Sequence, residues 1–184
     1  MADVLVARKM KQKTLLITIL FAVLFCVSFV ILFKHFQMKR QLAAGEPRIQ
    51  KEIPLPDVSF SDVNGNKLPE DEIRKGKVVL MFLMTDCHYC ESEATFVNQL
   101  ITKRNDIKFY GIISGGDKRK QLETASAKFP ISVLYDDSLL AVKLSITKVP
   151  IKIYLEDGVI KKAWGGASVD ETRKAEFVSW LEGV

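Results

Sequence analysis

The strongest limit on how this chain can fold is a run of twenty residues without a charged side chain, from Thr14 to Phe33. As an α-helix rising about 1.5 Å per residue, this run is long enough to cross a hydrocarbon core of about 30 Å. A cleaved signal peptide is the alternative, but it has a shorter apolar region that small residues follow closely. Here Lys34 and His35 follow instead. We therefore predict a basic segment at residues 1–13 and an uncleaved transmembrane anchor at 14–33.

The positive charge of the chain is concentrated around this run. Residues 1–40 carry seven Lys or Arg against one acidic residue, whereas the remaining 20 basic residues are balanced by 21 acidic ones. The soluble part is therefore about neutral, and we expect no nucleic-acid partner. Four of the basic residues precede the apolar run and three follow it. This small excess favours a cytoplasmic N-terminus, with everything after the anchor outside the cytoplasm.

The remainder of the chain reads as a linker followed by one α/β domain. Residues 34–56 are mostly polar and end in Pro54 and Pro56, which favour an extended conformation. A domain at residues 57–184 is predicted from alternating strand and helix patterns, and Asn64-Gly65 indicates a hairpin turn near its start. The predicted elements are strands at 78–83, 107–114 and 131–135, helices at 89–103, 118–128 and 138–144, a hairpin at 151–164 and a final helix capped by Ser168 and Glu171. This order predicts a mixed central sheet flanked by helices.

Cys87 and Cys90 form a CxxC motif where a buried strand gives way to a helix. The N-terminus of a helix stabilises a thiolate, which is the species that attacks a disulfide. A purely structural disulfide across so short a loop adds little stability, and zinc needs about four ligands where this chain offers only two histidines. Covalent haem attachment requires a histidine where Glu91 stands. The motif therefore favours dithiol–disulfide chemistry, with no metal and no cofactor other than the cysteine pair.

Two further features accompany this motif: a hairpin before it, and Lys148-Val149-Pro150 before a second hairpin. Together, the three features make residues 57–184 resemble the membrane-anchored thioredoxin-like proteins of the TlpA and ResA type. The resemblance implies that Cys87 is the exposed attacking thiol, that Cys90 resolves the mixed disulfide, and that the two form a redox-active disulfide. It also implies a cis proline at Pro150 facing the pair. The backbone of Val149 would then be free to pair with an extended substrate.

Other positions in and near the motif remain open. Glu93 matches a carboxylate that ResA-like proteins keep near their cysteines, and as a helical neighbour of Cys90 it is a candidate for proton transfer. A solvated acid in the first helical turn is the alternative for Glu93. We place His88 and Tyr89 with Val149 in the substrate-binding set, although His88 could equally be an exposed loop residue. Met81 stands where thioredoxin keeps a buried acid.

The predicted function is a single-pass protein of the bacterial cytoplasmic membrane whose C-terminal domain reduces protein disulfides in the periplasm or an equivalent space. By resemblance it would serve cytochrome c maturation and receive electrons from a membrane partner, because no nucleotide or flavin motif is present. A DsbA-like oxidant is the main alternative, since such proteins also have valine before the cis proline. A peroxidase would need a threonine where Met84 stands, and a copper chaperone would need a distal histidine. A redox-inert binding module would lack one of the cysteines.

Overall fold

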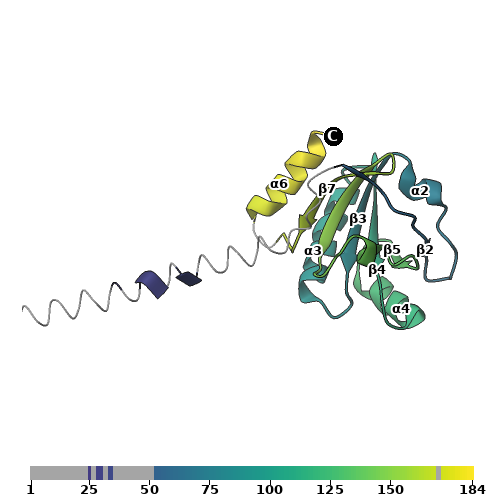
Figure 1. Cartoon of the computed structure of the whole chain (residues 1–184), viewed down its shortest axis with the longest axis horizontal. Helices are drawn as coiled ribbons and strands as arrows, with labels where there is room; N and C mark the ends of the chain where they lie inside the picture. Colours follow the sequence, from purple (N-terminus) through teal and green to yellow (C-terminus); the bar gives the residue numbers. More distant parts are fainter. Residues whose placement is uncertain (1–24, 26–27, 31–32, 35–51, 169–170) are drawn as a thin grey trace, which may run out of the picture. The chain divides into compact units, whose positions relative to one another are not determined.

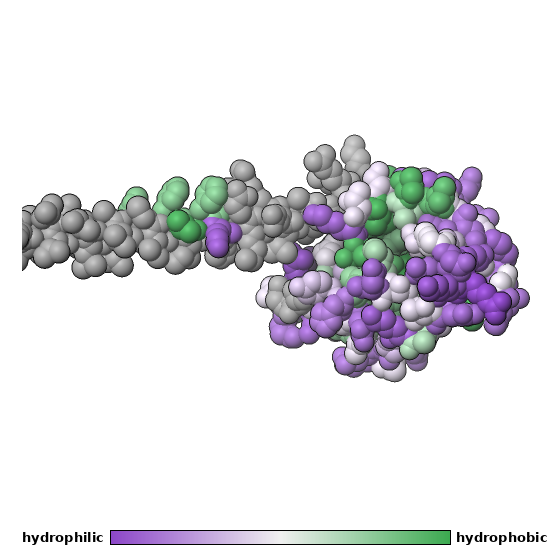
Figure 2. Space-filling view, turned by 90° about the horizontal axis from the view of Figure 1, so that it is seen from below, coloured by the Kyte–Doolittle hydropathy of each residue, from purple (hydrophilic) through white to green (hydrophobic). Residues whose placement is uncertain are grey.

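The computed structural model describes residues 25, 28–30, 33–34, 52–168 and 171–184. The chain divides into two units, Met1–Ala44 and Gly45–Val184. Most of the predicted anchor at 14–33 lies outside the described residues, and no helix within them is long and apolar enough to cross a membrane. The described residues of the first unit are helical. Large apolar side chains are exposed on it, and Figure 2 shows them in green: Phe25, Phe29, Val30 and Phe33.

The second unit is built on a mixed sheet with the strand order β1-β7-β6-β3-β4-β5-β2 (Figure 1). The central strands β3, β4 and β5 run parallel, and every other neighbouring pair is antiparallel. The predicted mixed sheet is therefore confirmed. The strands are β1 Ile53–Pro54, β2 Phe60–Ser61, β3 Lys77–Leu83, β4 Ile107–Ile113, β5 Val133–Asp136, β6 Ile151–Glu156 and β7 Val159–Gly165.

Helices cover both faces of this sheet. They are α2 Glu70–Arg74, α3 His88–Ile101, α4 Lys118–Lys128, α5 Leu140–Lys143 and α6 Glu171–Glu182. Buried residues of α3, α4 and α6 share one hydrophobic core with Val79 and Met81, whereas those of α2 and α5 share another with Leu80 and Phe82. Strand β3 therefore lies between two cores. This is why its sequence is continuously apolar, since successive side chains of a strand point to opposite faces.

The start of the domain differs from the prediction. The expected hairpin around Asn64-Gly65 consists of one bridge between Ser61 and Lys67, because β2 pairs mainly with β5. Helix α2, which the sequence analysis did not predict, follows this turn.

Part of the segment predicted as a linker contributes to the fold. Strand β1 pairs with β7, and Leu55 is buried in the core beneath α2. The guanidinium group of Arg74 donates hydrogen bonds to the carbonyl oxygens of Leu55, at 3.0 Å, and of Pro56, at 3.1 Å. These contacts attach residues 53–56 to the domain.

Candidate redox site

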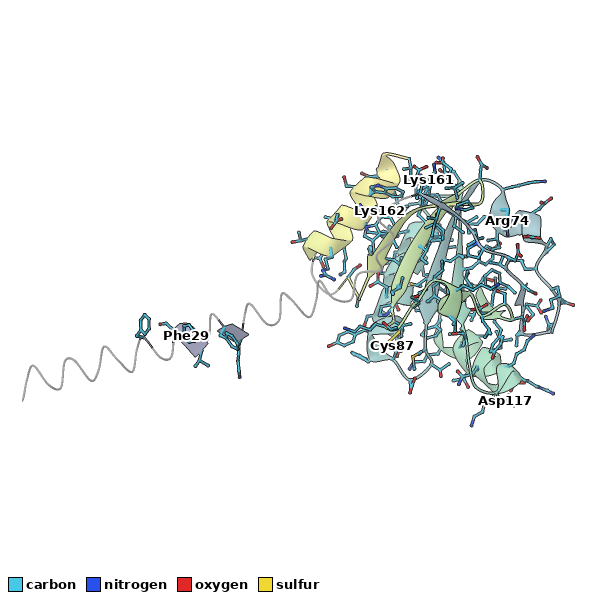
Figure 3. The ribbon with its side chains drawn as sticks, viewed as in Figure 1. Phe29, Arg74, Cys87, Asp117, Lys161 and Lys162 are labelled. Atoms are coloured by element: carbon cyan, nitrogen blue, oxygen red, sulfur yellow. A yellow bond between two sulfur atoms is a disulfide. The ribbon has the colours of Figure 1, made fainter. Side chains whose placement is uncertain are left out.

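Cys87 and Cys90 form a disulfide at the start of α3, with 5.2 Å between their Cα atoms (Figure 3). Cys87 is the N-cap residue of the helix, and its Sγ accepts a hydrogen bond of 3.2 Å from the backbone N–H of Cys90. Cys90 is fully buried, whereas Cys87 is half-buried. Because an incoming molecule meets only the outer sulfur, this difference agrees with an attacking role for Cys87 and a resolving role for Cys90.

The Val149–Pro150 peptide bond is cis, the isomer that the resemblance implied. Pro150 is buried and directly precedes β6, which runs antiparallel to β3 with Ile151 opposite Phe82. In this register, residues just before β6 lie opposite those just after β3. The cis bond therefore lies beside the segment that leads from β3 to Cys87.

The surface around the disulfide is partly apolar. Tyr89 between the cysteines is 58% exposed, and Met84 just before them is 49% exposed. His88 is also exposed, with its ring centroid 6.0 Å from that of Tyr89. These side chains and the half-buried Val149 are thus accessible to a partner beside Cys87. Their part in substrate binding stays a prediction.

Glu93 is buried, so a solvated acid is the wrong interpretation for it. Only 2% of its side chain is exposed, and its carboxylate forms an ion pair with the equally buried ammonium group of Lys152. Ser168 donates from its backbone N–H to Oε2, at 2.5 Å, and from its hydroxyl to Oε1, at 2.9 Å. Lys152 lies on β6 opposite Met81 of β3, so this pair joins the helix of the cysteines to the sheet and to the approach to α6.

The electrostatics of this cluster follow from its burial. Burial lowers the pKa of Lys152, because removing an ammonium from water disfavours its charged form, while the Glu93 carboxylate opposes that shift. The Lys152 Nζ also lies 4.9 Å from the centroid of the Phe177 ring. Three donors to one carboxylate are the arrangement that holds a buried charge. Whether Glu93 exchanges a proton with Cys90 stays a prediction.

Sequence reasoning missed Lys152 and the contacts of Ser168 with Glu93. The signal for Lys152 was its position as the one charged residue within the otherwise apolar run of residues 151–155. Ser168 was predicted to cap the final helix, and this stays a prediction because residues 169–170, between Ser168 and α6, lie outside the described residues. Its hydroxyl and N–H contact Glu93, and its hydroxyl accepts a hydrogen bond of 3.1 Å from Lys152. In the described part of the chain, no three His, Cys, Asp or Glu side chains are grouped to hold a metal.

No family model matches the chain, and no curated protein sequence matches it. Solved structures do. A protein from Chlorobium tepidum, described as a thiol:disulfide interchange protein DsbE, has a TM-score of 0.62 at 15% identity, over 72% of this chain and 96% of its own. A secreted disulfide oxidoreductase from Mycobacterium tuberculosis, homologous to E. coli DsbE, has a TM-score of 0.55 at 16% identity, over 68% and 95%.

The exposed lipoprotein thioredoxin Etrx1 of Streptococcus pneumoniae is similar too, with a TM-score of 0.55 at 18% identity, over 69% of this chain and 99% of its own. The second unit of the chain therefore has the thioredoxin-like α/β fold. Within that class, its structural neighbours include disulfide oxidoreductases of the DsbE type, which agrees with the resemblance to TlpA and ResA drawn from the sequence.

Proposed function

We propose that this chain is a thiol–disulfide oxidoreductase that reduces disulfide bonds in proteins. The observation that carries the proposal is the Cys87–Cys90 disulfide at the N-cap of α3, with one cysteine half-buried and the other fully buried. The neighbouring cis proline and the oxidoreductases among similar structures support it. Such a site needs no bound cofactor, because the cysteine pair itself carries the electrons.

The reaction begins with the reduced pair. The Cys87 thiolate attacks one sulfur of a substrate disulfide, forms a mixed disulfide and releases the other substrate sulfur as a thiolate, which takes up a proton. The Cys90 thiol then loses its proton and attacks Sγ of Cys87, which restores the Cys87–Cys90 disulfide and releases the second substrate thiol. Two electrons pass from the pair to the substrate, and a dithiol partner returns two electrons and two protons.

In this reaction Glu93 is our candidate to accept the proton of Cys90. It lies three residues beyond Cys90 on α3, where helical neighbours share a face, and both side chains are buried. A carboxylate within hydrogen-bond reach of a thiol, directly or through one water, can accept its proton.

The test is the reduction potential of the pair, measured by equilibration with glutathione or dithiothreitol buffers. A value near or below about −270 mV, that of thioredoxin, is expected for a reductant, whereas a value near about −120 mV would replace this proposal with disulfide formation. A Cys90→Ser variant should trap substrates on Cys87 as mixed disulfides. The matched Cys87→Ser variant should trap none.

We further propose that residues 14–33 anchor the domain to a bacterial cytoplasmic membrane, with residues 57–184 on its outer side. Besides the sequence of this run, the exposed Phe25, Phe29 and Phe33 support a lipid-facing surface. An alkaline phosphatase reporter, which is active only outside the cytoplasm, should be active when fused after Val184. An inactive fusion would place the domain inside.

The substrate class that we propose is an apocytochrome c whose cysteines must be reduced before haem is attached, with a membrane dithiol protein as the electron donor. Deleting the chain from its host should lower the content of c-type cytochromes, and added dithiothreitol should restore it. Normal cytochrome content in the deletion strain would point to other protein disulfides.

A further inference from the structure

We propose that Lys128, at the end of α4, positions the loop before Cys87 and stabilises the Cys87 thiolate through its positive charge. This inference rests on the proposed redox function, and it assigns a role to a residue far from the motif in the sequence. No feature of the CxxC motif itself points to it.

The ammonium group of Lys128 contacts both sides of the motif. Its Nζ donates a hydrogen bond of 2.8 Å to the carbonyl oxygen of Thr85, two residues before Cys87. It also lies 3.4 Å from a carboxylate oxygen of Glu91, the residue after Cys90. One cation therefore bridges the loop that enters the motif and the helix that leaves it.

The end of α4 is fixed in place, so this cation has a defined position. Ala125 and Phe129, on either side of Lys128, are buried in the same core as Cys90. A second contact joins α4 to the loop, because the hydroxyl of Thr85 lies 3.0 Å from Oε1 of Gln121. The loop is thus held by α4 at two points.

The other charged groups around Cys87 are exposed to water or paired with each other, so they do little to stabilise its thiolate. Asp86 precedes Cys87 and Glu91 follows the motif, and both are exposed anions. The ammonium group of Lys148, which precedes the cis bond, is also exposed, and so is the uncharged or charged ring of His88 within the motif. The buried pair of Glu93 and Lys152 balances itself.

Lys128 differs from these exposed groups because only 28% of its side chain is exposed and its ammonium is hydrogen-bonded to the loop. An opposite charge near a thiol favours the thiolate, and water screens a partly covered charge less than an exposed one. Stabilising the thiolate increases the fraction of Cys87 able to attack a disulfide.

The experiment measures the pKa of Cys87 in the reduced full-length chain in detergent. The rate of alkylation by iodoacetamide is followed from pH 4 to 10 by mass spectrometry of the peptide that contains Cys87, which separates it from Cys26. In Lys128→Gln and Lys128→Met we expect the pKa of Cys87 to rise by about one unit, which is about tenfold less thiolate at a pH below the pKa. Lys128→Arg should restore it. Lys120→Gln, an exposed position on the same helix, should leave it unchanged.

A purely structural role would change the alkylation rate at every pH without moving the midpoint, and that result would overturn the proposal. So would an equal shift in Lys120→Gln. Lys128→Met keeps an unbranched, mostly apolar side chain and removes the charge together with the hydrogen bond to Thr85, so it is a second variant in case Lys128→Gln misfolds. The readout needs no protein substrate, so the chain could fail to reduce proteins while Lys128 still acts on Cys87.

Discussion

At the scale of single residues, the buried ion pair of Glu93 and Lys152 makes the stability of the domain sensitive to the loss of either side chain. An ion pair out of water contributes little net stability, because desolvation offsets attraction, but the loss of one partner leaves an uncompensated charge. Ser168, which contacts both members, would then face a carboxylate without its cation.

We therefore predict that Lys152→Met lowers the free energy of unfolding by about 3–5 kcal/mol. Urea unfolding of the oxidised protein measures this loss. The double variant Glu93→Gln with Lys152→Met should recover part of it, because no charge then remains to be buried. A single variant within about 1 kcal/mol of the parent would contradict the prediction.

Tyr154 is the opposite case, a buried polar group without a partner. Its ring packs edge-on against Trp180, with 4.7 Å between centroids, and its hydroxyl has no hydrogen-bond partner among the described residues. Burial raises its pKa to about 12, so it is neutral near pH 7.

We predict that Tyr154→Phe leaves stability unchanged or raises it by up to about 1 kcal/mol, because the ring contacts remain and the unpaired hydroxyl is removed. Ser168→Ala is the matched control, since it deletes a hydroxyl that has two partners and should cost about 1–3 kcal/mol. Thermal unfolding of both variants checks this. A costly Tyr154→Phe would reveal a partner for the hydroxyl.

Asp137 gives the stability of the domain a dependence on acid. Burial raises the pKa of this carboxyl, but hydrogen bonds from Lys118, Lys67 and Ser61 outweigh burial and lower the pKa to about 2 from 3.8. A depressed pKa means that the folded state binds fewer protons than the unfolded state. The stabilisation is therefore present above pH 3.8 and is lost as the pH falls through about 2.

The expected outcome is that Asp137→Asn flattens the fall in melting temperature between about pH 4 and pH 2. The variant should also be less stable than the parent at pH 7, where the parent carboxylate is charged. Melting curves at intervals across this range measure both effects. Parallel curves for the two proteins would mean that Asp137 is not perturbed.

At the scale of elements, β1 shows that a two-residue strand can set a domain boundary. Leu55 is 3% exposed, and the two carbonyl oxygens bound by Arg74 follow directly from this strand. Full burial of a leucine side chain is worth about 1.5–3 kcal/mol.

A soluble form that begins at Asp57 should therefore be less stable than one that begins at Glu52, by about 2–3 kcal/mol. The difference is measured by guanidinium unfolding of the two forms. Leu55→Ala in the longer form is the control, and it should reproduce most of the loss. Equal stability of the two forms would mean that residues 52–56 are dispensable.

At the scale of the whole molecule, the redox state and the stability of the fold are linked. Folding changes the reduction potential of the cysteine pair. The oxidised and reduced forms therefore differ in their free energy of unfolding, by about 1.4 kcal/mol for each 30 mV of that change. A reductant is a protein whose fold favours its disulfide.

We accordingly predict that the oxidised protein unfolds at a higher urea concentration than the reduced protein. The comparison uses the same chain with and without dithiothreitol, and Cys87→Ser with Cys90→Ser serves as a reference that cannot change state. Greater stability of the reduced form would identify an oxidant, because strong oxidants such as DsbA have a stabilised reduced form.

Local patterns predicted much of this molecule. The continuous apolar run of β3, the helical period of α3 and the hairpin of β6 and β7 were foreseen within one or two residues at most ends, since each pattern is complete within about ten residues of sequence. The CxxC motif at a strand–helix junction likewise indicated redox chemistry from its position alone. The anchor at 14–33 stays a prediction, because most of it lies outside the described residues.

The sequence by itself thus determined the longer strands and helices, their order and the cysteine pair, but not β1 or α2. Only the tertiary structure decided that Glu93 pairs with Lys152, 59 residues away, and with Ser168, 75 residues away. The same holds for the contact of Lys128 with Thr85, across 43 residues. The physical reason is that periodicity reports which face of an element is apolar, whereas the partner of a buried charge depends on which faces meet when the sheet and helices pack.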